Sequence, residues 1–121
     1  MEYKKEVVVE GSGPVCPKGS NVIAHYTGRL QNGQKFDSSY DRRDPLQFKV
    51  GVGQVIKCWD VGITQMKVGE KAILTCPPDM AYGARGIPGV IPPKSTLFFD
   101  VELLAYKWAI NLTITLITDV P

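Results

Sequence analysis

The side chains that most often carry out acid–base or nucleophilic chemistry are scarce in this sequence of 121 residues. Its single histidine, His25, lies in an alternating segment typical of a strand, and no serine occupies a G-x-S-x-G turn. No glycine-rich phosphate loop precedes a helix, and the three cysteines form no C-x-x-C pair. These absences argue against a hydrolase, a nucleotide-binding enzyme and a metal site, and we expect no cofactor.

What remains is a set of aromatic side chains with few polar companions, one of which, Asp37, directly follows an aromatic residue. Two interpretations are open. The set could form an ordinary aromatic core, or it could line a deep apolar pocket with a few polar groups at its edge, which is the usual form of a ligand site. Its members are Tyr26, Phe36, Phe48, Trp59, Tyr82 and Phe99.

The segment YGARGIPGVIPP, residues 82–93, combines glycines, which permit sharp turns, with prolines, which restrict the backbone. It lies within a stretch of about twenty residues that shows no strand or long-helix pattern, and loops of that length are usually functional or disordered. Its apolar content argues against disorder. Because proline reduces the freedom of a chain without strand pairing, we expect residues 82–93 to present a fixed apolar surface.

The elements that must position these residues are mostly strands, because period-two alternation dominates the sequence. One segment, residues 55–66, favours a helix, with Ile56, Trp59 and Ile63 on one face. Gly62 weakens this short helix, so packing against the sheet must hold it. We predict an α+β fold in which an antiparallel sheet of five to six strands curls around one short helix. The predicted strands are residues 4–11, 21–30, 35–38, 46–50, 71–76 and 97–106, with a hairpin turn at 31–33.

Charge and cysteine content restrict the partners and the compartment. Lys plus Arg is 14 against 12 for Asp plus Glu, which is too balanced to indicate a nucleic-acid or membrane partner. The charged start MEYKKE lacks the apolar stretch of an export signal. Sparse cysteines without that signal predict free thiols and a cytoplasmic location. Cys58, in the first turn of the predicted helix beside Lys57, is either a reactive thiol or a buried one.

The sequence predicts one domain over residues 1–106 and an atypical tail over residues 107–121. In the tail, apolar residues alternate with polar ones, which is a strand pattern too short and too polar to span a membrane. An unpaired apolar strand can pair with a sheet edge of its own chain or of a neighbour. We expect a monomer, with dimerisation through the tail as the alternative. The alternating apolar residues are Ile110, Leu112, Ile114 and Leu116.

Five longer motifs resemble those of the FK506-binding protein (FKBP) family of peptidyl-prolyl isomerases, in order and spacing, over about residues 3–106. They are HYTGRL, GQKFDSSYDR, VGVGQVIKCWDVGITQMKVGEKA, AYGARGIPGVIPP and LFFDVELL. The resemblance implies a half-barrel sheet wrapped on the helix that contains Trp59, and an apolar cleft with Trp59 as its floor. It also implies an activity, the cis–trans interconversion of X–Pro peptide bonds without any covalent step.

Site residues follow from the same resemblance. It implies that the Ile56 amide and the Tyr82 hydroxyl donate hydrogen bonds to ligand carbonyls. It places Asp37 at the pocket edge near Tyr26 and Arg42, where it either acts on the rotating carbonyl or orients its neighbours. The implied catalytic residues are Tyr26, Asp37, Ile56, Trp59, Tyr82 and Phe99. The implied ligand-binding residues are these six together with Phe36, Arg42, Phe48, Gln54, Val55, Ile87 and Ile91.

The partners implied by the resemblance are proline-containing peptides or proteins and macrolide inhibitors such as tacrolimus (FK506) and rapamycin. Drug-bound family members present the pocket rim to calcineurin or to a TOR kinase. Two rim residues depart from the best-known members, since Ile87 replaces a frequent histidine and Met80 a frequent tyrosine, so recruitment of those proteins is a separate question. The alternative is a binding or chaperone module with little turnover, but retention of the pocket residues favours the enzyme.

Overall fold

The computed structural model describes residues 1–108. Its main feature is a six-stranded antiparallel sheet with the strand order β1-β5-β6-β2-β3, in which β4 pairs with the first half of β2. The strands are β1 (Lys4–Val9), β2 (Asn21–Arg29), β3 (Lys35–Ser38), β4 (Leu46–Lys49), β5 (Lys71–Cys76) and β6 (Leu97–Lys107). The helices are α1 (Ser39–Arg42), α2 (Lys57–Ile63) and the 3₁₀ helix η1 (Pro78–Met80).

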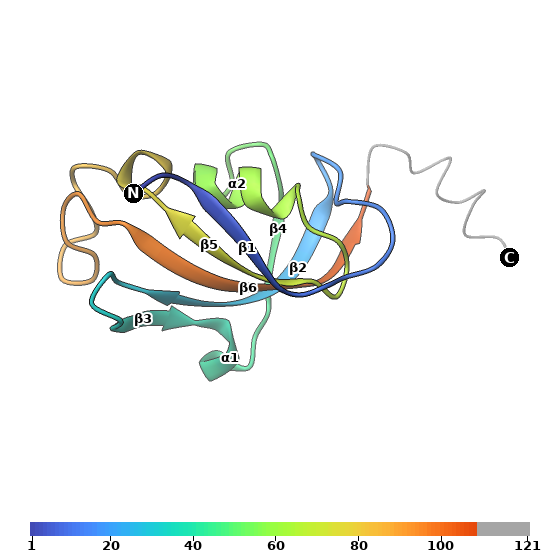
Figure 1. Ribbon diagram of the computed structural model, residues 1–121, viewed down its shortest axis with the longest axis horizontal. Helices are drawn as coiled ribbons and strands as arrows, with labels where there is room; N and C mark the ends of the chain where they lie inside the picture. Colours follow the sequence, from blue (N-terminus) through green and yellow to red (C-terminus); the bar gives the residue numbers. More distant parts are fainter. Residues whose placement is uncertain (109–121) are drawn as a thin grey trace, which may run out of the picture.

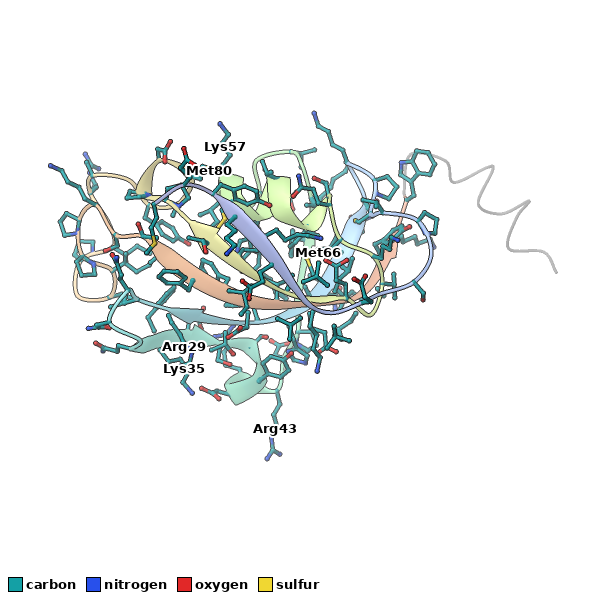
Figure 2. The ribbon with its side chains drawn as sticks, in the orientation of Figure 1. Arg29, Lys35, Arg43, Lys57, Met66 and Met80 are labelled. Carbon is teal, nitrogen blue, oxygen red and sulfur yellow. A yellow bond between two sulfur atoms is a disulfide. The ribbon has the colours of Figure 1, made fainter. Side chains whose placement is uncertain are left out.

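Figure 1 shows α2 against one face of the twisted sheet, with α1 following β3 at its far edge. The strand alternation explains this arrangement, because every second residue of β6 faces α2. Leu97, Phe99, Val101 and Leu103 are all buried, and β2 and β5 alternate in the same way. Met66, just after α2, lies between helix and sheet and is fully buried (Figure 2).

The short helix α2 is held by close packing rather than by its own length. Gly62 permits this packing, since a Cβ atom at that position would lie only 2.7 Å from Cδ1 of Leu74 in β5. Trp59 and Ile63, predicted to lie on the apolar face, are buried. The helix is nevertheless shorter than the predicted residues 55–66, because Ile56, with a non-helical backbone (φ −59°, ψ 150°), forms its N-cap and Thr64 (φ −72°, ψ 0°) forms its C-cap.

The predicted α+β fold is confirmed, with six strands that agree closely with their expected ranges. The hairpin at residues 31–33 is present, joining the antiparallel pair β2 and β3. Two elements were not predicted, α1 and η1, because four- and three-residue helices are too short to show a periodic pattern. The strand pattern predicted in the tail, residues 110–116, lies outside the described residues.

The loop after η1 is folded on itself. Ile87 and Ile91 form an isolated bridge, with both N–H to O=C distances at 2.8 Å, and the Lys94 amide donates to the Gly83 carbonyl at 3.0 Å. Gly86 is required here, since its φ is +63° and a Cβ atom would lie 2.2 Å from the Ile91 carbonyl oxygen. This internal bonding agrees with the expected fixed shape.

The prediction of free thiols is wrong for two of the three cysteines. Cys58 and Cys76 form a disulfide, and Cys16 is a buried free cysteine. The packing of α2 on the end of β5 brings the Cα atoms of the pair to 5.6 Å, inside the range that a disulfide spans. A separation of 18 residues along the chain gives no indication of this contact. Cys58 is therefore no reactive thiol in this structure.

Candidate active site

The floor of the candidate site is the indole of Trp59, which α2 holds against the concave face of the sheet and which is buried. Three aromatic rings surround it. The ring centroids of Tyr26, Phe99 and Phe48 lie 4.8, 5.2 and 5.7 Å from that of Trp59, the first two edge to face. Such edge-to-face contacts favour one orientation of each ring, so the floor is a rigid apolar surface.

The wall opposite α2 comes from β3 and β6. Phe36 and Phe99 meet edge to face with their centroids 5.7 Å apart. They can approach because β2 carries Gly28 between them, where a Cβ atom would lie 2.6 Å from Cζ of Phe36 and 2.8 Å from Cε1 of Phe99. A glycine in the middle of a strand is thus required by the width of the aromatic wall.

These surfaces enclose an open cleft of about 170 Å³. Most of its lining is aromatic or aliphatic, with an acidic group and an amide at the edge. The lining residues are Tyr26, Phe36, Asp37, Leu46, Gln54, Val55, Ile56, Trp59, Tyr82 and Phe99. The second interpretation of the aromatic set is therefore the better one, although Trp59 and Phe99 also belong to the core.

A hydrogen-bonded triad of Tyr26, Asp37 and Arg42 forms the polar edge. The Tyr26 hydroxyl donates to Oδ2 of Asp37 at 2.5 Å, and Nη2 of Arg42 donates to the Tyr26 hydroxyl at 2.8 Å. Nη1 of Arg42 also forms an ion pair with Oδ1 of Asp37. The unpredicted helix α1 places Arg42 at the triad, whereas Arg43, its neighbour, extends into solvent (Figure 2).

This network shifts the pKa values of its members. Partial burial raises the pKa of the Asp37 carboxyl, but hydrogen bonds from Tyr26 and Arg42 and the charge of Arg42 outweigh it, so the net pKa is lowered. Burial and then the hydrogen bond to Asp37 raise the pKa of Tyr26. Burial, followed by the negative charge of Asp37, also raises the pKa of Tyr82. At neutral pH the edge therefore holds a carboxylate and two protonated phenols.

The Ile56 amide and the Tyr82 hydroxyl are among the hydrogen-bond donors at the cleft that are free to bind a guest. Ile56 forms the N-cap of α2, and its carbonyl accepts from the amides of Trp59 and Asp60 at 3.0 and 3.1 Å. Within residues 1–108 neither the amide of Ile56 nor the hydroxyl of Tyr82 donates to a protein acceptor. Tyr82 is 40% exposed, so its hydroxyl can meet a ligand at the cleft mouth.

Of the thirteen residues expected at the site, nine line the cleft and four do not. Arg42 reaches it only through Asp37 and Tyr26, and Phe48 packs behind the indole of Trp59. Ile91 is 3% exposed, within the core, and Ile87 packs against that core. The nine lining residues are Tyr26, Phe36, Asp37, Gln54, Val55, Ile56, Trp59, Tyr82 and Phe99.

Leu46 lines the cleft and was not among the expected residues. The sequence pattern could have identified Leu46, because Leu46 and Phe48 are two residues apart in β4 and must share a face. The role of Gly28 was also missed, and its position in the middle of a strand pattern was the only hint. His25, which the sequence places in a strand, bonds through Nδ1 to Ser39 at 2.8 Å, stacks on Tyr40 and is not among the residues that line the cleft.

Comparisons with known proteins agree with this geometry. Residues 13–104 match the family model of FKBP-type peptidyl-prolyl cis-trans isomerases. FK506-binding protein 1 of Saccharomyces cerevisiae is 62% identical over 102 residues, 84% of this chain and 90% of the yeast protein. Peptidyl-prolyl cis-trans isomerase FKBP1A of Xenopus laevis is 54% identical over 105 residues, 86% of this chain and 97% of the frog protein.

A solved structure is also similar. The crystal structure of AtFKBP13 superposes with a TM-score of 0.81 and 44% sequence identity, covering 87% of this chain and 93% of that one. The described part of the chain contains no helix with the length and apolar character needed to cross a membrane.

Proposed function

Because this chain belongs to the FKBP-type peptidyl-prolyl cis-trans isomerase family, it catalyses rotation about the peptide bond before proline, and we propose that this rotation takes place in the cleft above Trp59. The observation that carries the proposal is the cleft itself, about 170 Å³ in volume and lined mainly by rings and aliphatic groups. A cavity of roughly 150 Å³ holds benzene, so this cleft has room for a pyrrolidine ring.

The reaction needs only a modest reduction of a barrier. Resonance in the amide gives a barrier of about 18–20 kcal/mol, and uncatalysed exchange takes tens to hundreds of seconds, as general values. A turnover of roughly 1 to 10³ per second requires a barrier lower by about 3–7 kcal/mol. Rotation breaks no covalent bond, so the reaction requires no nucleophile.

Two features of the cleft support this reduction. The planar amide is more dipolar than the twisted one, so an apolar site on Trp59 and Phe99 destabilises the ground state relative to the transition state. The free donors, the Ile56 amide and the Tyr82 hydroxyl, would hold the carbonyls that flank the rotating bond. A substrate bound in this turn is restricted to geometries close to the twist.

We assign Asp37 primarily to holding Tyr26 and Arg42, since both oxygens of its carboxylate accept hydrogen bonds from these residues. Its charge also faces the cleft, where it can act on the carbonyl carbon as the bond rotates. Substitution of Asp37 by Asn separates the two roles, because an amide can retain one hydrogen bond but carries no charge.

The direct test is an isomerisation assay on short peptides with different residues before proline, with and without FK506. Four of the similar proteins are named FK506-binding proteins, which supports binding of this drug in the same cleft. We expect turnover that FK506 abolishes competitively. Turnover that FK506 leaves unchanged would place the active site elsewhere on the chain, and no turnover in a folded sample would favour a binding module.

We further propose that the drug-bound protein presents the rim near Met80 and Ile87 to calcineurin or to a TOR kinase. Both side chains are partly buried against the core, so they offer a smaller and more apolar surface than a histidine and a tyrosine. Pull-down of purified calcineurin with and without FK506, and of a TOR kinase with and without rapamycin, tests this proposal. Capture that is independent of the drug, or capture of neither protein with its drug, would contradict it.

A cytoplasmic location is also a proposal, and it rests on the sequence alone. The Cys58–Cys76 disulfide is the observation that opposes it, because disulfides are typical of oxidising compartments. Immunoblotting of cell fractions, with alkylation of free thiols before lysis, tests both points together. A cytoplasmic protein whose two cysteines are alkylated in cells would fit the composition, whereas a protein found only in secretory fractions would exclude the proposal.

A further inference from the structure

The segment that carries Val55 and Ile56 to the cleft has few bonds of its own. Val50 is buried and anchored, since its amide donates to Ser20 and its carbonyl accepts from Gly19. Between Val50 and Ile56, residues 51–55 make no backbone-to-backbone hydrogen bond to any other part of residues 1–108. Two of them, Gly51 and Gly53, have φ values of +81° and +82°. A glycine-rich loop of this kind has many accessible conformations.

Side chains supply the missing bonds, and Asp60 supplies two of them. Its Oδ1 accepts from the Gly51 amide at 2.7 Å and its Oδ2 accepts from the Gly53 amide at 3.0 Å. Each carboxylate oxygen therefore holds one of the two glycines, and charge-assisted bonds of this kind are stronger than neutral ones. The remaining bond joins the loop to β4, since the amide of Lys49, the last residue of that strand, donates to Oε1 of Gln54 at 2.8 Å.

The backbone of Asp60 holds the other end of the same segment. Its amide donates to the Ile56 carbonyl at 3.1 Å, as part of the first turn of α2. A single residue thus fastens the loop on both sides of Val55 and Ile56, which line the cleft. Asp60 also directly follows Trp59. The floor of the cleft and its wall at Val55 and Ile56 are therefore both attached to the first turn of α2.

We propose that Asp60 is a positioning residue for substrate binding, which fixes the Val55 wall and the free Ile56 amide before a substrate arrives. This inference rests on the proposed use of the cleft. Asp60 does not line the cleft and contributes no group to the reaction. Its contribution is a lower ordering cost on binding, because a loop that is already in its bound geometry loses less conformational entropy.

The main test is Asp60→Asn, which preserves the shape of the side chain but replaces one acceptor oxygen with a donor that opposes an amide. We expect KM and the Kd for FK506 to rise about five- to tenfold while kcat stays within about twofold, because the loss concerns binding rather than the rotation step. Asp60→Glu retains both acceptors and should restore KM to within about threefold of the unchanged protein. Amide hydrogen exchange at Gly51 and Gly53 should accelerate in Asp60→Asn.

Thr64→Val is the matched control within α2. The Thr64 hydroxyl bonds to the carbonyls of Asp60 and Val61 and not to the loop. This variant should lower the melting temperature at least as much as Asp60→Asn does, yet leave KM and exchange at the two glycines unchanged. If both variants raise KM in parallel with their loss of stability, Asp60 has only a structural role and the proposal fails.

Two further outcomes would also overturn it. Unchanged exchange at Gly51 and Gly53 in Asp60→Asn would mean that the carboxylate does not hold the loop. Faster exchange with KM and Kd both unaltered would mean that the loop does not need to be held. Amide hydrogen exchange is measured without substrate, so it tests the loop independently of activity. If the protein without any substitution shows no turnover, the proposed function is refuted, but the exchange measurement still tests whether Asp60 holds the loop.

Discussion

Tyr82 contributes to the cleft through a hydroxyl that has no acceptor within residues 1–108. If this hydroxyl holds a substrate carbonyl, Tyr82→Phe should lower kcat/KM about three- to tenfold, the effect of one uncharged hydrogen bond. The melting temperature should change little. Tyr40→Phe is the matched control, since the Tyr40 hydroxyl bonds to Glu102 at 2.7 Å, outside the cleft lining. Equal activity in the two variants would remove Tyr82 from the proposed mechanism.

The carboxyl of Asp37 makes stability depend on pH in a defined direction. Its pKa in the folded protein is lower than the ordinary 3.8, so the unfolded chain binds more protons in the window between the two values. The stabilisation is complete above 3.8 and is lost as pH falls through the lower, folded value. Denaturation of the unchanged protein and of Asp37→Asn at pH 7 and from pH 4 down to pH 2 measures this. We expect the difference in free energy of unfolding between the unchanged protein and Asp37→Asn to shrink as the pH falls toward 2. A difference that stays constant over this range would contradict the prediction.

At the scale of elements, the loop over residues 82–93 offers a paired test of shape. Gly86 and Gly89 both have positive φ, at 63° and 78°, but only Gly86 is crowded. Gly89→Ala should therefore cost about 1–2 kcal/mol of stability, the backbone penalty alone. Gly86→Ala should cost about 1–3 kcal/mol more, because its Cβ would lie against the Ile91 carbonyl.

Activity should follow the same order, since displacement of Ile91 moves the loop that carries Tyr82. The measurements are urea denaturation and kcat/KM for both variants. If Gly89→Ala proves the more damaging of the two, the loop is controlled by something other than the close approach at Gly86.

The strands and the main helix were predictable because their patterns are local. Burial of alternate residues along β5 and β6 follows directly from the alternation of apolar and polar residues. The limits of α2 were not predictable, because the non-helical backbone at Ile56 and the C-cap at Thr64 carry no pattern of their own. The short helix α1 was missed for the same reason, and with it the position of Arg42 beside Asp37 was known only by resemblance to a family.

At the scale of the whole molecule, the feature that bears on self-association is the edge of the sheet formed by β1. Strand β1 ends the strand order, and Val7, Val8 and Val9 are exposed on it. Exposed apolar edge strands are sites for pairing with a further strand. We propose that the apolar pattern in residues 110–116 gives the full chain a weak tendency to dimerise, while a chain ending at Lys107 stays monomeric.

Sedimentation velocity over a range of concentrations, on the full chain and on residues 1–107, measures this tendency. A shift toward the dimer at high concentration is expected for the full chain alone. The proposal is withdrawn if both forms sediment as monomers at every concentration, or if both dimerise equally.

The sequence by itself determined the strand pattern, the helix that carries Trp59, the identity of the loop over residues 82–93, and the family. These features depend on neighbours a few residues apart or on runs of matching residues. Only the tertiary structure decided that Cys58 meets Cys76, that Gly28 admits Phe36 and Phe99, and that both carboxylate oxygens of Asp60 hold the loop before Ile56. The physical reason is that such contacts depend on how packed elements approach one another, to within a fraction of an ångström, and no local period encodes that distance.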